Sequence, residues 1–503
     1  MSSEVPERSH GSFESFKFSI FPIEKTTDFL KTVLKVALLV CAITSISLFL
    51  YSAFTSQTRW FRCPECSAPT RNTGQLCESR NVSADNIGPT NISHIIFGIG
   101  GSMKTWKNRR RYSEIWWQPN VTRGFVWLDE KPATNSSWPE NSPPYRVSED
   151  WTRFKYSSSR SAVRMARIVL ESFRLGLPDV RWFVMGDDDT VFFTENFVSV
   201  LAKYDHRQMY YIGGNSESVE QDEMHSYGMA FGGGGIAISY SLAVELVNIL
   251  DGCLDRYYKF YGSDQRIAAC VSEIGVSLTT ERGFHQMDIR EDPYGLLAAH
   301  PVAPLVSLHH LDAVKPLFPN QNQIDSLRYL IQAYQVDPAR TMQQSFCYHP
   351  KQNWSVSISW GYTAQLYPWL LTAKELETPL QTFRTWRSWK DGPFTFNTRR
   401  MSADPCEQPV VYFLDRVEEV GEGETLSSYK RYVFEPEKKC ERAEYASAMA
   451  VQKIIVSAFK MHPNEWKKEP RRDCCEISKS LKKGTMHVRI RHCKRSETIT
   501  TPT

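Results

Sequence analysis

Three consecutive aspartates, Asp187, Asp188 and Asp189, directly follow the apolar run Trp182–Met185 and Gly186. Their mutual repulsion costs free energy unless a cation offsets it. In an extended backbone Asp187 and Asp189 point to one side, with Cα atoms about 7 Å apart, and can together bind a divalent metal ion and the hydroxyls of a ribose. Oxygen ligands favour Mg²⁺ or Mn²⁺, and an added histidine favours Mn²⁺. The alternative is a loop whose aspartates only form a turn or cap a helix.

Three further segments carry residue types that could complete such a site. Asp264 lies in a turn, where it could act as a general base toward an acceptor hydroxyl or cap a helix beginning near Gln265, and the two roles are compatible. His309 and His310 follow an apolar run, and because neighbours on an extended segment point to opposite sides, we expect at most one to be a ligand. Four glycines within Phe231–Ser239 allow close backbone approach, although such a run is more often a turn.

The elements around these residues alternate between strand and helix patterns. Strands are expected at His94–Gly98, Phe125–Leu128 and Trp182–Met185, and helices at Lys104–Trp117 and Ser161–Phe173. This order predicts an α/β domain with a largely parallel sheet. Ligands of open α/β sheets bind beyond the carboxyl ends of the strands, which is where Asp129 and the aspartate triplet fall.

Taken in order, the segments WFVMGDDDTVFF, FGGGGIAIS, YGSDQRIAAC and SLHHLD resemble the Fringe-like glycosyltransferases of the β1,3-glycosyltransferase superfamily. The nearest pattern is a plant-type branch formerly described as a domain of unknown function. The resemblance covers about residues 90–315. It implies a GT-A fold, which is Rossmann-like with a mixed, mostly parallel sheet. It also implies an inverting, metal-dependent transfer of a hexose or N-acetylhexosamine from a UDP-sugar to a glycan or glycoprotein hydroxyl, with a β1,3 linkage expected.

The resemblance also implies roles for individual residues. Asp189 would bind Mn²⁺ (or Mg²⁺), with His310 as the other protein ligand and His309 as the alternative. Asp264 would be the catalytic base. The residues expected to bind the nucleotide sugar are Asp129, Asp187, Asp188, Gly233 and Gly234. A disulfide between Cys253 and Cys270 would flank this region. Ser263 departs from the family pattern, which often has an acidic residue there, so the acceptor stays open.

Before this region, residues 36–54 form a run of nineteen without a charge. As a helix they would span about 28 Å, close to one hydrocarbon core. The alternative, a cleaved signal peptide, is disfavoured by the 35 residues that precede the run. Flanking Lys and Arg residues, four before and three after, hardly decide the orientation.

Glycosylation sequons and cysteines decide the orientation better. Eleven of the twelve cysteines follow the apolar run, as do all five N-x-S/T sequons, at Asn81, Asn91, Asn120, Asn135 and Asn353. We therefore expect a type II single-pass protein of the Golgi membrane with a lumenal catalytic domain. The predicted parts are a cytoplasmic tail (1–35), an anchor (36–54), a stem (55–89), a GT-A domain (90–318) and an accessory domain (319–503).

The accessory domain is predicted to be mostly β, because short apolar and alternating runs recur through it. It contains six cysteines, Cys347, Cys406, Cys440, Cys474, Cys475 and Cys493, for which fifteen pairings are possible. Such a domain could bind a carbohydrate acceptor, or it could only cover the catalytic domain.

The composition excludes few alternatives. The formal charge of +4 gives no reason to expect nucleic acid as a partner, and the oligomeric state stays open. The main alternative to an enzyme is a catalytically inactive, carbohydrate-binding membrane protein with the same fold. A metal-dependent hydrolase is a third hypothesis, which lacks a second ligand cluster for a two-metal site.

Overall fold

The computed structural model describes residues 26–55, 88–133, 137–155, 160–387, 392–434, 439–468, 470–478 and 484–502. The chain divides into two units, Met1–Ala84 and Asp85–Thr503. In the first unit the described residues form one helix, α1 (Thr26–Thr55). Within the described residues no helix has both the length and the apolar character needed to cross a membrane, so the span predicted at 36–54 is not confirmed. The predicted tail before Thr26 and most of the predicted stem lie outside the described residues.

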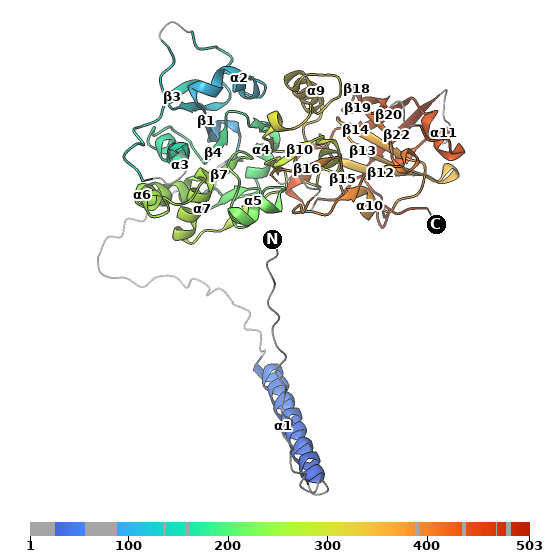
Figure 1. Ribbon diagram of the computed structural model, residues 1–503, viewed down its shortest axis with the longest axis horizontal. Helices are drawn as coiled ribbons and strands as arrows, with labels where there is room; N and C mark the ends of the chain where they lie inside the picture. The colour runs from blue at the N-terminus through green and yellow to red at the C-terminus, as the bar shows by residue number, and fades with distance from the viewer. Residues whose placement is uncertain are drawn as a thin grey trace, which may run out of the picture. The chain divides into compact units, whose positions relative to one another are not determined.

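The second unit is built around a seven-stranded sheet with the order β3-β2-β1-β4-β7-β6-β8 (Figure 1). Its strands are β1 (Ile95–Gly100), β2 (Arg123–Leu128), β3 (Tyr145–Val147), β4 (Trp182–Asp187), β6 (Tyr211–Gly213), β7 (Ile236–Ser239) and β8 (Leu278–Thr280). The first four strands in this order are parallel, and β7 is antiparallel to both of its neighbours. The mixed α/β architecture with a parallel sheet is therefore confirmed.

Both faces of this sheet are buried, as expected for central parallel strands. Along β1 and β4 successive side chains alternate between two cores: Ile95 and Val184 enter one, while Ile96 and Phe183 enter the other. The helices of this part are α2 (Met103–Glu114), α3 (Arg160–Phe173), α4 (Thr194–Leu201), α5 (Val219–Met224), α6 (Tyr240–Arg256) and α7 (Ser263–Ile274). Helices α3, α6 and α7 pack on one face and on one another.

The C-terminal part is mostly β, as predicted, and eight of its strands form a sheet that closes on itself. In spatial order these strands are β12 (Gln344–His349), β13 (Trp354–Ser359), β14 (Thr363–Tyr367), β18 (Val410–Gly421), β19 (Glu424–Tyr432), β20 (Lys453–Phe459), β22 (Thr485–Arg491) and β21 (Cys474–Ile477). Its six cysteines pair as Cys347–Cys475, Cys406–Cys440 and Cys474–Cys493.

Shorter elements lie between the two sheets and in the connections of the closed sheet. The helices are α8 (Tyr294–Ala298), α9 (Gln323–Val336), α10 (Ala373–Glu377) and α11 (Ala443–Met449), and the strands are β10 (Ile289–Glu291), β15 (Leu380–Gln381), β16 (Phe383–Thr385) and β17 (Arg399–Arg400). Strand β16 comes from the C-terminal part and pairs antiparallel with β10, which precedes residue 318. One hydrophobic core contains residues of both parts, from Ile95 to Ile490. The predicted boundary at 318 therefore does not separate two cores.

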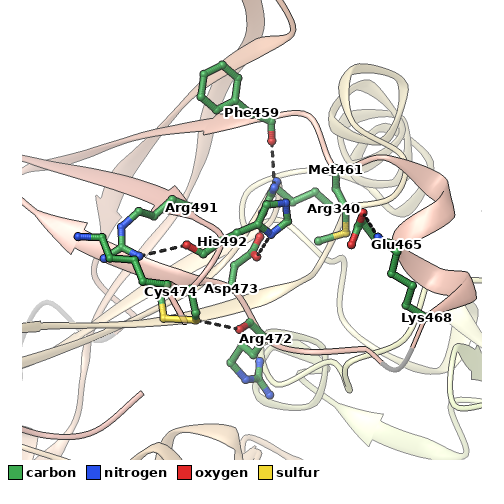
Figure 2. A network of polar contacts seen from close by, with 12 residues as sticks. Arg340, Phe459, Met461, Glu465, Lys468, Arg472, Asp473, Cys474, Arg491 and His492 are labelled. Atoms are coloured by element: carbon green, nitrogen blue, oxygen red, sulfur yellow. Dashed lines mark hydrogen bonds and ion pairs between the residues drawn. A yellow bond between two sulfur atoms is a disulfide. The ribbon is translucent and has the colours of Figure 1, made fainter. Parts of the chain in front are cut away.

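A buried ion pair fixes the segment after α9 to the closed sheet (Figure 2). Arg340 places Nη1 at 2.7 Å from Asp473 Oδ2 and donates from Nη2 to the carbonyl of Phe459 at 2.9 Å. Its Nε lies 3.4 Å from Asp337 Oδ2, and the three charged side chains are at most 6% exposed. Arg340 is thus the shared counter-charge of two buried carboxylates.

We predict that Arg340→Met lowers the free energy of unfolding by about 3 kcal/mol or more, because Asp337 and Asp473 would stay buried without their cation. Denaturant unfolding of the variant and the parent protein measures the difference. The matched control is Arg328→Met, which removes an exposed ion pair with Asp325 and is expected to cost less than about 1 kcal/mol. Equal effects of the two substitutions would contradict the prediction.

Candidate metal centre and active site

A small three-stranded sheet brings the aspartate triplet and the histidines together. Strand β5 (Val191–Phe192) begins two residues after Asp189, and β11 (Ser307–Leu308) ends one residue before His309. Strand β11 pairs antiparallel with β5, with Leu308 opposite Val191, and parallel with β9 (Phe284–His285). Two short pairings therefore make neighbours of residues that lie 120 positions apart in the chain.

Asp187, Asp189 and His309 form one cluster. Nε2 of His309 lies 3.1 Å from Asp189 Oδ1 and 3.7 Å from Asp187 Oδ2. One potential ligand atom from each residue lies within 4.8 Å of those of the other two. Two carboxylates and an imidazole at such distances form a donor set that suits a divalent metal ion.

Several polar atoms of this cluster lack hydrogen-bond partners among the described residues. Asp189 is 1% exposed, yet neither of its carboxylate oxygens has a hydrogen-bond partner of good geometry among the described residues, and the same holds for Nδ1 of His309. The contacts of Asp189 are the ion pairs with His309 and with Nη2 of Arg109, at 3.2 Å. Buried acceptors are normally hydrogen-bonded, so this free acceptor capacity fits the binding of a divalent cation.

The protonation equilibria of the cluster reflect the same shortage of positive charge. Burial raises the pKa of Asp187 to about 7, and although His309 opposes the rise, Asp189 adds to it. Burial also acts to raise the pKa of Asp189, but the charges of His309 and Arg109 hold it well below its usual range. Burial alone would lower the pKa of His309, whereas the carboxylates of Asp189 and Asp187 raise it to about 9. A bound metal ion would replace the proton on His309 as the balancing charge.

His310 does not belong to this cluster, which corrects the predicted ligand set. The backbone of His310 is left-handed, with φ 52° and ψ 27°, so the alternation of an extended segment ends there. Its Nδ1 lies 2.8 Å from Asp288 Oδ1, and its ring stacks on Trp386 with centroids 4.4 Å apart. The alternative, His309, is the histidine that joins Asp187 and Asp189.

A cavity of about 420 Å³ opens beside the cluster, at the carboxyl ends of β1 and β4. The residues that line it include Gly100, Ser102, Thr105, Arg109, Arg164, Asp187, Asp188, Phe231, Tyr261, Asp264, Gln286, Asp288, His310 and Trp386. This is the position in which open α/β sheets bind ligands. The cavity therefore brings Asp187 and Asp264, from separate sequence segments, to one surface.

Asp264 lies in the first turn of α7, and the N-cap residue of this helix is Gly262. One carboxylate oxygen of Asp264 accepts from the backbone N–H of Gly232 at 3.1 Å, and the other accepts from that of Gln265 at 2.8 Å. The predicted capping role of Asp264 is therefore wrong, because Gly262 is the N-cap and Asp264 lies inside the helix, but its carboxylate does line the cavity. Two backbone donors hold the carboxylate while it faces the cavity.

Asp129 and Asp188 support the walls of the cavity. Asp129 accepts from Ser102 Oγ at 2.7 Å and from the backbone N–H of Met103 at 2.9 Å, so it fixes the start of α2. Burial acts to raise the pKa of Asp129, but these hydrogen bonds outweigh it and lower the pKa. Asp188 accepts from Thr105 Oγ1 at 2.8 Å and from Arg109 Nη1 at 3.1 Å.

The glycine run lies behind the cluster. A Cβ atom on Gly233 would come within 2.0 Å of Cε1 of His309, so only glycine leaves room for this ring. Gly234 donates its N–H to Gln286 Oε1 at 2.6 Å, and Gly235 has a φ of +105°. Gly233 and Gly234 therefore shape the cluster from behind, and neither is among the residues that line the cavity.

Three residues of the site were not found from the sequence. Arg109 lies on the helix predicted at Lys104–Trp117, but its pairing with Asp188 and Asp189 depends on how α2 packs. Asp288 belongs to no motif. Trp386 reaches the cavity from the C-terminal part, through the β10–β16 pairing, and no local pattern could signal that contact.

The remaining predicted residues are placed as follows. Cys253 and Cys270 form a disulfide that joins α6 to α7, as the resemblance implied. Asn91, Asn120 and Asn353 are exposed, which sequon glycosylation requires. Asn81 and Asn135 lie outside the described residues.

Fold and site together define an α/β protein with a candidate divalent-metal centre at the carboxyl ends of its central strands. The chain belongs to the family described as "Protein of unknown function, DUF604", whose model matches residues 221–475, half of the chain. This description assigns no activity, so the Fringe-like character stays a prediction.

Comparison with curated proteins and with solved structures does not assign an activity to the chain. No curated protein is detectably similar to the chain in sequence. Among solved structures, one described as "Crystal structure of a glycosyltransferase involved in the glycosylation of the major capsid of PBCV-1" has a TM-score of 0.25 and 12% sequence identity, over 46% of this chain and 96% of that chain. A likeness at this TM-score supports no argument about fold or activity.

We predict that Gly233→Ala weakens the binding of Mn²⁺ by at least about tenfold, because the added methyl group forces the buried ring of His309 away from Asp189. Calorimetric titration of the protein with Mn²⁺ measures the change. Gly232→Ala is the matched control, since a Cβ atom there meets no atom nearer than 3.4 Å. Unchanged Mn²⁺ affinity in a folded Gly233→Ala protein would contradict the assigned position of His309.

Proposed function

We propose that this protein is a metal-dependent, inverting glycosyltransferase of the GT-A and Fringe-like type. It would transfer a hexose or N-acetylhexosamine from a UDP-sugar to a hydroxyl of a glycan or glycoprotein, with a β1,3 linkage. The observation that carries the proposal is that Asp187, Asp189 and His309 converge beside a cavity that also contains the carboxylate of Asp264.

The cluster supplies the ligands that such a reaction needs. Asp187, Asp189 and His309 would hold Mn²⁺ (or Mg²⁺), and the under-satisfied oxygens of Asp189 support that fit. When bound, the ion neutralises the charge that develops on a departing diphosphate. The guanidinium of Arg164 adds positive potential along the same wall of the cavity.

Asp264 is suited to the proton transfer. In a single displacement the acceptor oxygen attacks the sugar carbon as the diphosphate leaves, and a base must take the hydroxyl proton. The N–H groups of Gly232 and Gln265 fix the carboxylate, and each of its oxygens keeps a lone pair for that proton. The proposed base is thus positioned without any mobile partner.

The proposed location is the lumen of the Golgi. Four disulfides among the described residues and three exposed sequons support an oxidising, glycosylating compartment. Anchoring by residues 36–54 is part of this proposal.

The direct test is to incubate the protein with Mn²⁺ and a panel of UDP-sugars and to measure release of UDP. Slow hydrolysis of one donor would identify the transferred sugar even before the acceptor is known. Binding of a UDP-sugar without any turnover, with or without glycan acceptors, would favour an inactive carbohydrate-binding protein. Absence of both binding and turnover would exclude the proposal.

We predict that Asp264→Asn lowers turnover about 100-fold or more and leaves binding of the UDP-sugar nearly unchanged, because the amide cannot accept the proton. Initial rates and calorimetric titration separate the two effects. Asp325→Asn, on the exposed side of α9, is the control and should leave both unchanged. Turnover near that of the parent protein would remove Asp264 from the role of base.

We predict further that Asp189→Ala abolishes the metal-dependent part of nucleotide binding, since one of the two carboxylate ligands is lost. Titration of the variant with UDP, with and without Mn²⁺, measures this part directly. The parent protein treated with a chelator should behave like the variant. An undiminished Mn²⁺ effect in the variant would place the metal elsewhere.

A further inference from the structure

His310 has no place in the metal cluster, yet it lies in the cavity. Its side chain is 25% exposed, and it lines the cavity together with Asp288 and Trp386. A polar ring held at the wall of a binding cavity, and not needed for the metal, requires another explanation.

A chain of hydrogen bonds fixes which nitrogen of His310 carries the proton. The backbone N–H of Ser218 donates to Ser216 Oγ at 3.1 Å, and Ser216 Oγ donates to Asp288 Oδ2 at 2.7 Å. The other oxygen of this buried carboxylate, Oδ1, lies 2.8 Å from Nδ1 of His310. Because a carboxylate only accepts, Nδ1 must donate, and Nε2 of the neutral ring is left as an acceptor.

The plane of the ring is fixed as well. Trp386 stacks on His310 with 10° between the ring planes, and the ring of His309 packs against His310 with centroids 3.8 Å apart. Trp386 is itself held by its carbonyl, which accepts from Arg290 Nε at 2.9 Å, and by the β10–β16 pairing that ends at Thr385. A ring with a fixed tautomer and a fixed plane presents its acceptor in one direction.

We propose that Nε2 of His310 accepts a hydrogen bond from a hydroxyl group of a bound sugar, and that Asp288 and Trp386 are positioning residues for it. A sugar hydroxyl is a donor that suits a neutral imidazole nitrogen, and it is abundant in the substrates of the proposed reaction. This inference rests on the proposed function. It extends that function by making the C-terminal part, through Trp386, necessary for sugar recognition.

Both the donor sugar and the acceptor glycan carry hydroxyls, and the experiment distinguishes them. His310→Ala, Asp288→Asn and Trp386→Ala are compared with the parent protein, and Trp369→Ala is the control. Trp369 is also a half-buried indole of the C-terminal part, but it packs on Tyr367 outside this cavity. For each protein the affinities for UDP and for the UDP-sugar are measured with Mn²⁺, together with kcat and KM for both substrates.

If the hydroxyl belongs to the donor sugar, His310→Ala weakens binding of the UDP-sugar about tenfold and leaves binding of UDP unchanged. If it belongs to the acceptor, the KM for the acceptor rises about tenfold and both donor affinities are unchanged. In either case the parent protein binds the deoxy analogue that lacks this hydroxyl more weakly than the natural sugar. The His310→Ala protein no longer distinguishes the two. Asp288→Asn and Trp386→Ala should shift the same constant in the same direction.

Two results would overturn the inference while the proposed function stands. In one, the parent protein is active and His310→Ala changes every constant by less than about twofold. In the other, His310→Ala weakens the binding of UDP as much as the binding of the UDP-sugar. That result would place His310 at the diphosphate or the metal. A parent protein that neither binds nor turns over any UDP-sugar would instead refute the proposed function, and this inference with it.

Discussion

The structure depends on keeping three adjacent carboxylates at the end of a buried strand. Asp189 is almost fully enclosed, and Asp188 is 3% exposed, so solvent does little to screen them. The positive groups within reach are His309 and Arg109, each in ion-pair contact with Asp189. Removing them would leave the buried carboxylate of Asp189 without its ion-pair partners among the described residues. The fold must therefore hold an imidazole and a guanidinium in place around the triplet.

Much of the architecture serves that requirement. The β5–β11 pairing places His309, the absence of a side chain at Gly233 makes room for its ring, and packing of α2 places Arg109. His309 and Arg109 carry the balancing charge of the cluster, and a bound divalent ion would share that task. The free acceptor capacity of Asp189 favours a metal centre over a purely structural ion network.

The sequence predicted the elements that local patterns encode. The strand Trp182–Met185 and its aspartates were recognisable because an apolar run that ends in charged residues has few other structural interpretations. The β character of the C-terminal part followed from its short apolar and alternating runs. The local sequence pattern could not decide whether His309 or His310 is the metal ligand, because this depends on the left-handed backbone of His310 and on the register of β11 against β5. The disulfide pairing of the C-terminal part likewise depends on how its sheet closes.

Trp386 shows why the predicted boundary at 318 does not describe how the site is built. The cavity needs residues from the main sheet, from α7 and from the segment after β16. One hydrophobic core joins the main sheet to the C-terminal part, while the apolar side chains of α7 belong to the second core. The match to the DUF604 family begins within α5 and ends within β21, so it also runs across that boundary. A part that only covered the seven-stranded sheet would bury apolar surface without entering the cavity. Because this part also supplies an aromatic ring that fixes His310, its closed sheet and the strands leading to it act as a scaffold for the site.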